Sequence, residues 1–198
     1  QVAVDSGHLQ GLEVHAYINT FPLWRGTELP SVSDPAHALT VHPQWLIADG
    51  DGTPQALNSS YVFASPGNPS VQAHVRSVAA DIARNYAVDG VHLDYIRYPG
   101  SQYSHDATSE ARWAADGGDW GDWQRAQIVA TAAGVSDAVE VPVTAAVWGI
   151  HTNVFGWSGV SQGAVDYYQD SFAFLETGAL DANIPMIYWP VSEVEGTR

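Results

Sequence analysis

The chain has 198 residues, of which 45% are hydrophobic, and it carries 8 Trp, 9 Tyr and 5 Phe, so it has enough apolar surface for a folded core. Seven basic residues, all Arg, stand against 22 acids, and the formal net charge of −15 argues against nucleic acid or an anionic membrane surface as partner. The absence of cysteine excludes disulfides and thiolate metal sites, and no window approaches the roughly 18–20 apolar residues that insert into a membrane.

The first half of the chain predicts two strands and one long helix. Residues 1–11 have a weak helical pattern that ends at Gly11, and residues 12–18 (LEVHAYI) alternate as a strand does. Residues 19–69 are rich in Pro, Gly, Ser and Asp and predict a long irregular excursion. Apolar residues spaced by three and four predict an amphipathic helix over 69–86, and GVHLDYI at 90–96 predicts the second strand.

The second half repeats this order. We expect a polar, Trp-rich loop at 99–119, a helix at 120–134 that ends at Gly134, and a strand at 141–149 (VPVTAAVWG). A further helix is expected at 163–177, before Gly178, and a last strand at 184–189 (IPMIYW). The chain therefore predicts four strands that alternate with helices.

This alternation is typical of an α/β protein with a parallel sheet. The loops that follow the strands are long and aromatic, which is the asymmetry of a (β/α)8 barrel with its chemistry at the carboxyl ends of the strands. A complete barrel has eight strands and about 250 residues. We therefore expect residues 1–198 to be a single catalytic domain that forms an incomplete TIM barrel and is a fragment of a longer chain. Two alternatives are self-association through the open sheet edges and strands overlooked in the long loops.

The stretch DGVHLDYIRYPG, residues 89–100, contains the strongest candidate for chemistry. Val91 and Leu93 fall on one face of the expected strand, while His92 and Asp94 fall on the other. Aspartate is depleted in strands, and a carboxylate on the interior side costs several kcal/mol unless it is paired. Asp94 therefore has either a structural partner, for which Arg97 is the candidate, or a function.

Several motifs, taken in order, resemble the glycosyl-hydrolase-like 10 family: GLEVHAYINT (11–20), HPQWLIADGDG (42–52), VDGVHLDYIRYP (88–99) and IPMIYW (184–189). The resemblance implies a secreted or cell-envelope barrel, hence an extracytoplasmic protein, that cleaves glycans such as peptidoglycan. It also implies that the four strands are the third to sixth of the barrel. Tyr95 stands where the family often has a second acid next to Asp94, and Met186 stands where the family often has Gln.

Glycoside hydrolysis ordinarily needs two carboxyl groups on either side of the scissile bond. Asp94 is the first candidate, as nucleophile or general base held ionised by Arg97. No acid ends the strand at 141–149 or the strand at 184–189, so the second carboxylate is expected from a loop or from outside the chain. The loop candidates are Asp49, Asp51, Asp116, Asp119, Asp122, Glu193 and Glu195.

His15 and His92 alternate onto the same side of their strands as Asp94. A metal-dependent hydrolase that uses His15, His92 and Asp94 is one alternative, since catalytic metal sites need about three convergent ligands. No further metal-ligand motif supports it. We therefore expect both histidines to bind a sugar hydroxyl or a neighbouring strand, with no metal and no cofactor.

The remaining predicted substrate contacts lie at or just beyond the ends of the strands. Flat aromatic rings offer a platform to a sugar, while polar side chains bind its hydroxyls. The candidates are Asn19, Arg97, Tyr98, Trp148, Tyr188 and Trp189. The sequence thus predicts a glycoside hydrolase that acts on a polysaccharide or peptidoglycan-type glycan, and a non-catalytic glycan-binding barrel is the second alternative.

Overall fold

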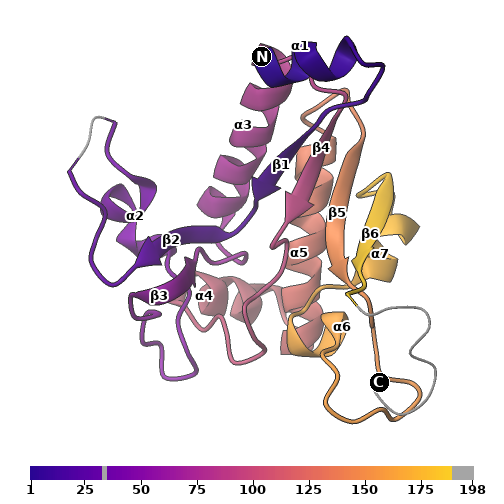
Figure 1. The fold of residues 1–198 in the computed structure, drawn as a ribbon. Coiled ribbons are helices and arrows are strands. Elements are labelled where there is room, and N and C mark those ends of the chain that lie inside the picture. Colours follow the sequence, from indigo (N-terminus) through magenta and orange to yellow (C-terminus); the bar gives the residue numbers. More distant parts are fainter. Residues whose placement is uncertain (33–34, 189–198) are drawn as a thin grey trace.

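The computed structural model describes residues 1–32 and 35–188 and contains a four-stranded parallel sheet (Figure 1). The strand order is β1-β4-β5-β6, so neighbours in the sheet follow the order of the chain. The strands are β1 (His15–Asn19), β4 (Gly90–Asp94), β5 (Val143–Trp148) and β6 (Ala182–Met186). All four therefore end at the same edge of the sheet.

Helices in the connections between these strands cover one face of the sheet (Figure 1). They are α3 (Pro69–Asn85), α4 (Ala107–Asp116) with α5 (Trp120–Ser136), and α6 (Gly163–Asp166) with α7 (Ser171–Glu176). A short helix, α1 (Val2–His8), lies beside the amino ends of the strands. None of the described helices is long and apolar enough to cross a membrane.

The two faces of the sheet have different chemistry because side chains alternate along each strand. The helix-facing side is buried and apolar, and it includes Val91, Leu93, Val143, Ala145 and Val147. The other side carries His15, Tyr17, Asn19, His92, Asp94, Thr144 and Trp148, which the registers between strands place on one surface. We call this second surface the inner face, because in a closed barrel it lines the interior.

The expected fold class is confirmed. Four parallel strands in sequential order, with helices on one side only, form part of a (β/α)8 barrel. Within the described residues, β1 and β6 each have a neighbour on one side only. Self-association through these edges, the single-domain organisation of residues 1–198 and the fragment hypothesis stay predictions.

The segment 19–69, which was predicted to be irregular, contains strands and short helices that its composition did not indicate. An antiparallel hairpin pairs β2 (Pro22–Gly26) with β3 (Asn58–Phe63), and α2 (Ala38–Val41) and the 3-10 turn η1 (Pro43–Trp45) lie between them. The expected loop at 99–119 was also partly wrong, because it contains α4. Asp106 begins this helix by accepting hydrogen bonds from the amides of Thr108 and Ser109.

The predicted helix at 163–177 forms two short helices, α6 and α7, and the burial of Gln169 between them explains the break. The backbone at Tyr168 has a φ of 52°, which is incompatible with a continuous helix. This turn buries Gln169, whose side-chain amide donates to the carbonyls of Ile96 and Ala146 and whose oxygen accepts from the amide of Trp148. The bend therefore ties the α6–α7 segment to the carboxyl ends of β4 and β5.

Candidate active site

Asp94 is the last residue of β4 and lies at the carboxyl edge of the sheet. The register pairs it with Asn19, the last residue of β1. The predicted strand at 90–96 is too long by two residues, because Tyr95 has a φ of 50° and turns the chain away from the sheet. Asp94 therefore stands where a parallel strand opens into a loop, which is the catalytic position in barrel enzymes.

Both oxygens of the Asp94 carboxylate face hydrogen-bond donors. Oδ1 accepts from the amide of Tyr95 at 2.6 Å and lies 3.6 Å from Nη1 of Arg97. Oδ2 accepts from the hydroxyl of Tyr17 at 2.5 Å. The sequence analysis missed Tyr17, although its alternation with His15 and Asn19 placed it on the same face as Asp94.

Arg97 is held between aromatic rings as well as beside Asp94. Its guanidinium lies 4.5 Å from the ring centroid of Tyr95 and 5.4 Å from that of Trp148, and Trp148 in turn stacks on Tyr167 at 4.6 Å. Burial lowers the pKa of Arg97 from its ordinary value, while the charge of Asp94 acts in the opposite direction. A guanidinium stays protonated in proteins, so Arg97 keeps its positive charge at neutral pH.

His92 lies one step deeper on the inner face than Asp94. Its Nδ1 is 2.8 Å from the hydroxyl of Thr144 on β5, and its ring stacks on Tyr17 with the centroids 5.9 Å apart. Burial lowers the pKa of His92, and His15 lowers it further, while Asp94 acts to raise it. A neutral imidazole on this face suits a hydrogen bond to a strand or to a sugar hydroxyl.

His15 lies at the other end of the strand from the candidate site. It pairs with Gly90, four residues before Asp94, and so stands roughly 13 Å from the carboxyl edge. Its ring packs so closely on Gly90 that a Cβ there would lie 2.4 Å from Nδ1. Residues 1–32 and 35–188 contain no group of three His, Asp or Glu arranged to hold a metal ion. The metal-site hypothesis with His15, His92 and Asp94 is therefore wrong for the described residues, and His15 does not join the site at Asp94.

The prediction that Tyr98 contacts substrate is also wrong, because Tyr98 is 0% exposed. Its hydroxyl donates to the side-chain oxygen of Gln124 on α5, and its ring meets Tyr168 edge to face. Burial raises the pKa of Tyr98 well above its usual value. The turn at Tyr95 reverses the alternation expected from the strand, which sends Tyr98 into the core.

The other predicted sugar contacts remain accessible to different degrees. Asn19 is exposed at the end of β1, and Trp148 is half-buried at the end of β5. Tyr188, two residues beyond β6, is 85% exposed. Trp189 lies outside the described residues, as do Glu193 and Glu195. Asn19, Trp148 and Asp94 thus come from the ends of three neighbouring strands, and the sugar contacts of Asn19, Trp148 and Tyr188 stay predictions.

Four of the loop acids proposed as the second carboxylate have structural contacts, while Asp51 stays a prediction. Asp119 begins α5 by accepting from the amide of Asp122, and Asp122 pairs with Arg125 at 2.5 Å. Asp116 accepts from the indole of Trp123. Asp49 holds a turn by accepting from the amides of Asp51 and Thr53. Each of these four acids is thus bound by a group close to it in the chain, and on the strands of the inner face Asp94 is the only acid within the described residues.

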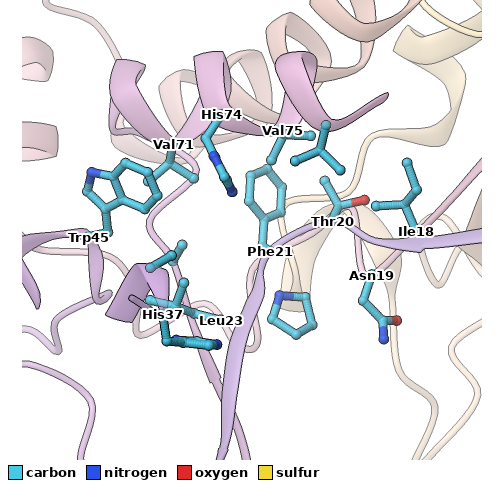
Figure 2. A pocket seen from close by; sticks show the side chains of 14 residues that line it. Ile18, Asn19, Thr20, Phe21, Leu23, His37, Trp45, Val71, His74 and Val75 are labelled. Carbon is cyan, nitrogen blue, oxygen red and sulfur yellow. The ribbon is translucent and has the colours of Figure 1, made fainter. Parts of the chain in front are cut away.

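A cavity of about 240 Å³ lies between α3 and the end of β1, and its lining includes Asn19 (Figure 2). Its walls come from α3, the end of β1 and the hairpin segment, and they include Ile18, Thr20, Phe21, Trp45, Val71, His74 and Val75. Most of these side chains are apolar. The cavity therefore continues the apolar layer between the sheet and the helices, whereas the polar groups around Asp94 lie on the inner face.

Comparisons with known proteins agree with this architecture. The glycosyl hydrolase-like 10 family matches residues 1–197. Glycosyl hydrolase DigH of Escherichia coli (strain K12) is 28% identical over 214 residues, covering 97% of this chain and 46% of that protein. Glycosyl hydrolase YngK of Bacillus subtilis (strain 168) is 23% identical over 206 residues, covering 95% of this chain and 38% of that protein. The chain spans less than half the length of these curated relatives.

One solved structure shares the fold over most of the chain. It is the α-L-fucosidase isoenzyme 2 of Paenibacillus thiaminolyticus, which matches with a TM-score of 0.54 and 20% identity, covering 76% of this chain and 23% of that one. The family model supports a role of the glycoside hydrolase type, and the solved structure supports the fold alone. The chain belongs to the glycosyl hydrolase-like 10 family.

Proposed function

We propose that the chain forms part of the catalytic barrel of a glycoside hydrolase in which Asp94 is a catalytic carboxylate. The observation that carries this proposal is the placement of Asp94 at the end of β4, on the inner face, with donors directed at both of its oxygens. With a donor at each oxygen, the Asp94 carboxylate is held in one orientation, which suits a nucleophile or a general base.

In the retaining form of the mechanism, a carboxylate oxygen of Asp94 bonds to the anomeric carbon while the bond from that carbon to the leaving oxygen breaks. A second carboxylic acid protonates the leaving oxygen, and water then hydrolyses the glycosyl-enzyme. In the inverting form, Asp94 removes a proton from the attacking water instead. We place the acid in a loop or outside the described residues, since no second carboxyl group accompanies Asp94 on the inner face of the four strands.

The substrate class proposed is a polysaccharide or peptidoglycan-type glycan. Trp148 and Tyr188 offer aromatic surface near the carboxyl ends of β5 and β6, while Asn19 and His92 offer polar groups beside Asp94. This combination of rings and hydrogen-bonding groups suits a sugar, which has apolar C–H faces and polar hydroxyls. The proposal needs no cofactor.

The test uses the full-length protein as its gene encodes it, incubated with a panel of purified polysaccharides and peptidoglycan. Release of reducing ends or soluble fragments is measured for the wild type, Asp94→Asn and the control Asp137→Asn, which changes an exposed acid at the end of α5. We expect Asp94→Asn to lose at least about 10³-fold in rate and Asp137→Asn to retain full rate. Full turnover by Asp94→Asn would refute the assignment.

A glycan-binding barrel without catalysis is the second candidate, and the lack of a second acid beside Asp94 on the described inner face favours it. The same panel separates the two functions. Binding to a glycan in affinity electrophoresis, combined with no product after prolonged incubation of the full-length wild type, would establish the binding module. Product that depends on Asp94 would establish the enzyme.

We also propose an extracytoplasmic location, because cell-wall and secreted glycans are found there. Fractionation of cells that produce the full-length protein, with a cytoplasmic and an envelope marker in parallel, tests this. Recovery in the cytoplasmic fraction alone would refute it.

A further inference from the structure

The hydroxyl of Tyr17 lies where the ends of β1 and β4 meet. Its oxygen is 2.5 Å from Oδ2 of Asp94 and 3.1 Å from Oδ1 of Asn19. The ring stacks on His92 with an interplanar angle of 28°. Tyr17 therefore contacts both polar residues that β4 presents on the inner face.

A phenol has a single proton, so the two oxygens beside Tyr17 compete for it. The Asp94 contact is the shorter, and a bond to an ionised acceptor is stronger than a bond to a neutral amide oxygen. Burial raises the pKa of Tyr17, and the hydrogen bond and the charge of Asp94 raise it further. The phenol thus keeps its proton, and acts as a donor, throughout the neutral range and beyond its ordinary titration near pH 10.

We propose that Tyr17 is a positioning residue for Asp94: its hydroxyl binds Oδ2 while the amide of Tyr95 binds Oδ1, and together they fix the orientation of the carboxylate. The catalytic consequence of this contact rests on the proposed function of Asp94, whereas the contact itself does not.

The arrangement assigns a role to Asp94 within the pair of carboxyl groups. To act as the general acid, Asp94 would carry a proton on one oxygen, but each oxygen already faces an N–H or O–H proton. Protonation of Oδ2 would force the Tyr17 hydroxyl to turn to the longer contact with Asn19, and protonation of Oδ1 would oppose the fixed amide of Tyr95 and the charge of Arg97. Asp94 is therefore the nucleophile or base, and the acid is another residue.

The contact is tested by NMR, which requires no turnover. Full-length protein is labelled with ¹³C at Cζ of tyrosine, and the Tyr17 signal is identified by its loss in Tyr17→Phe. We expect Asp94→Asn to move the Tyr17 Cζ signal upfield at pH 7, because the variant removes a charge-assisted bond from the phenol. Asp137→Asn is the matched control and should leave the signal unchanged. An unchanged Tyr17 signal in Asp94→Asn would overturn the inference.

The catalytic consequence is tested by kinetics on the glycan that the panel identifies. Tyr17→Phe keeps the ring and its stacking on His92 and removes one hydroxyl, so we expect kcat to fall about 10-fold while KM stays within about 2-fold. Tyr86→Phe, an exposed tyrosine at the end of α3, is the control. A wild-type kcat in Tyr17→Phe would overturn the positioning role. If the Tyr17 signal moves as expected but the wild type turns over no glycan, the contact stands and the proposed function fails.

Discussion

Nη1 of Arg97 lies 3.6 Å from Oδ1 of Asp94, and the two side chains are only 11% and 16% exposed. At this distance the contact is an ion pair beyond hydrogen-bond range. Nη1 is buried and makes no hydrogen bond within the described residues. The rings of Tyr95 and Trp148, on which the guanidinium lies, therefore determine its position as much as the carboxylate does.

Arg97→Met should lower the free energy of unfolding by about 1–3 kcal/mol, because it leaves a largely enclosed carboxylate without its cation. Arg97→Lys restores the charge but has no planar group to stack on the rings, so we expect an intermediate loss. Urea denaturation followed by tryptophan fluorescence measures both. The control is Arg84→Met, which changes an exposed arginine in the last turn of α3. Equal stability of Arg97→Met and Arg84→Met would contradict this prediction.

Tyr188→Ala should weaken glycan binding without changing stability. The side chain is 85% exposed, so its removal costs little packing, whereas loss of an aromatic platform for a sugar costs about 1 kcal/mol, or roughly 5-fold in affinity. Isothermal titration with the glycan identified by the panel gives the affinity, and a thermal melt gives the stability. Wild-type affinity in this variant would remove Tyr188 from the proposed sugar contacts.

Gln169→Leu should be among the more destabilising single changes in the chain. The leucine has a similar volume but leaves the carbonyls of Ile96 and Ala146 and the amide of Trp148 without their buried partner. Each such group costs about 1–3 kcal/mol, and partial relaxation reduces the sum, so we expect about 3 kcal/mol. Chemical denaturation of Gln169→Leu and Gln169→Glu measures the loss. A change below about 1 kcal/mol would show that the bend between α6 and α7 does not depend on this side chain.

Acidification from pH 7 to pH 5 should lower the thermal stability partly through two histidines. Burial lowers the pKa of His74, with a further contribution from His42, and burial likewise lowers that of His92. In the unfolded chain these histidines bind protons near their ordinary pKa of about 6.5, whereas in the folded chain they bind protons only at lower pH. The unfolded state therefore takes up protons first as the pH falls. The contribution of the two histidines to the free energy of unfolding is present above about pH 6.5 and is lost below it.

The melting temperature is measured between pH 8 and pH 5 for the wild type and for His74→Gln. We expect the melting temperature of the variant to fall less on acidification than that of the wild type, because one of the two histidines is absent. If the melting temperatures of both proteins fall equally with pH, the protonation of His74 is not linked to folding.

The periodicity of the sequence was sufficient for the parallel sheet and its longest helices. The alternation of LEVHAYI and GVHLDYI and the spacing of apolar residues in α3 and α5 depend on local side-chain patterns, so their positions are confirmed to within a few residues. The hairpin of β2 and β3 was missed, because its strands are separated by more than 30 residues and are defined by pairing with each other. This pairing joins segments that are distant in the sequence, so no local pattern of side chains predicts it.

The position of Asp94 at the end of a buried strand was likewise readable from the sequence, because polar and apolar residues alternate up to it. By itself the sequence also determined the fold class and the aromatic loops at one end of the strands. Only the tertiary structure decided which groups surround Asp94. A left-handed turn at Tyr95 sends Tyr98 into the core, and the register of β1 against β4 brings Tyr17 to the carboxylate while leaving His15 at the far end. Alternation fixes the face on which a side chain lies, but strand register and the loop conformation fix which side chains on that face meet.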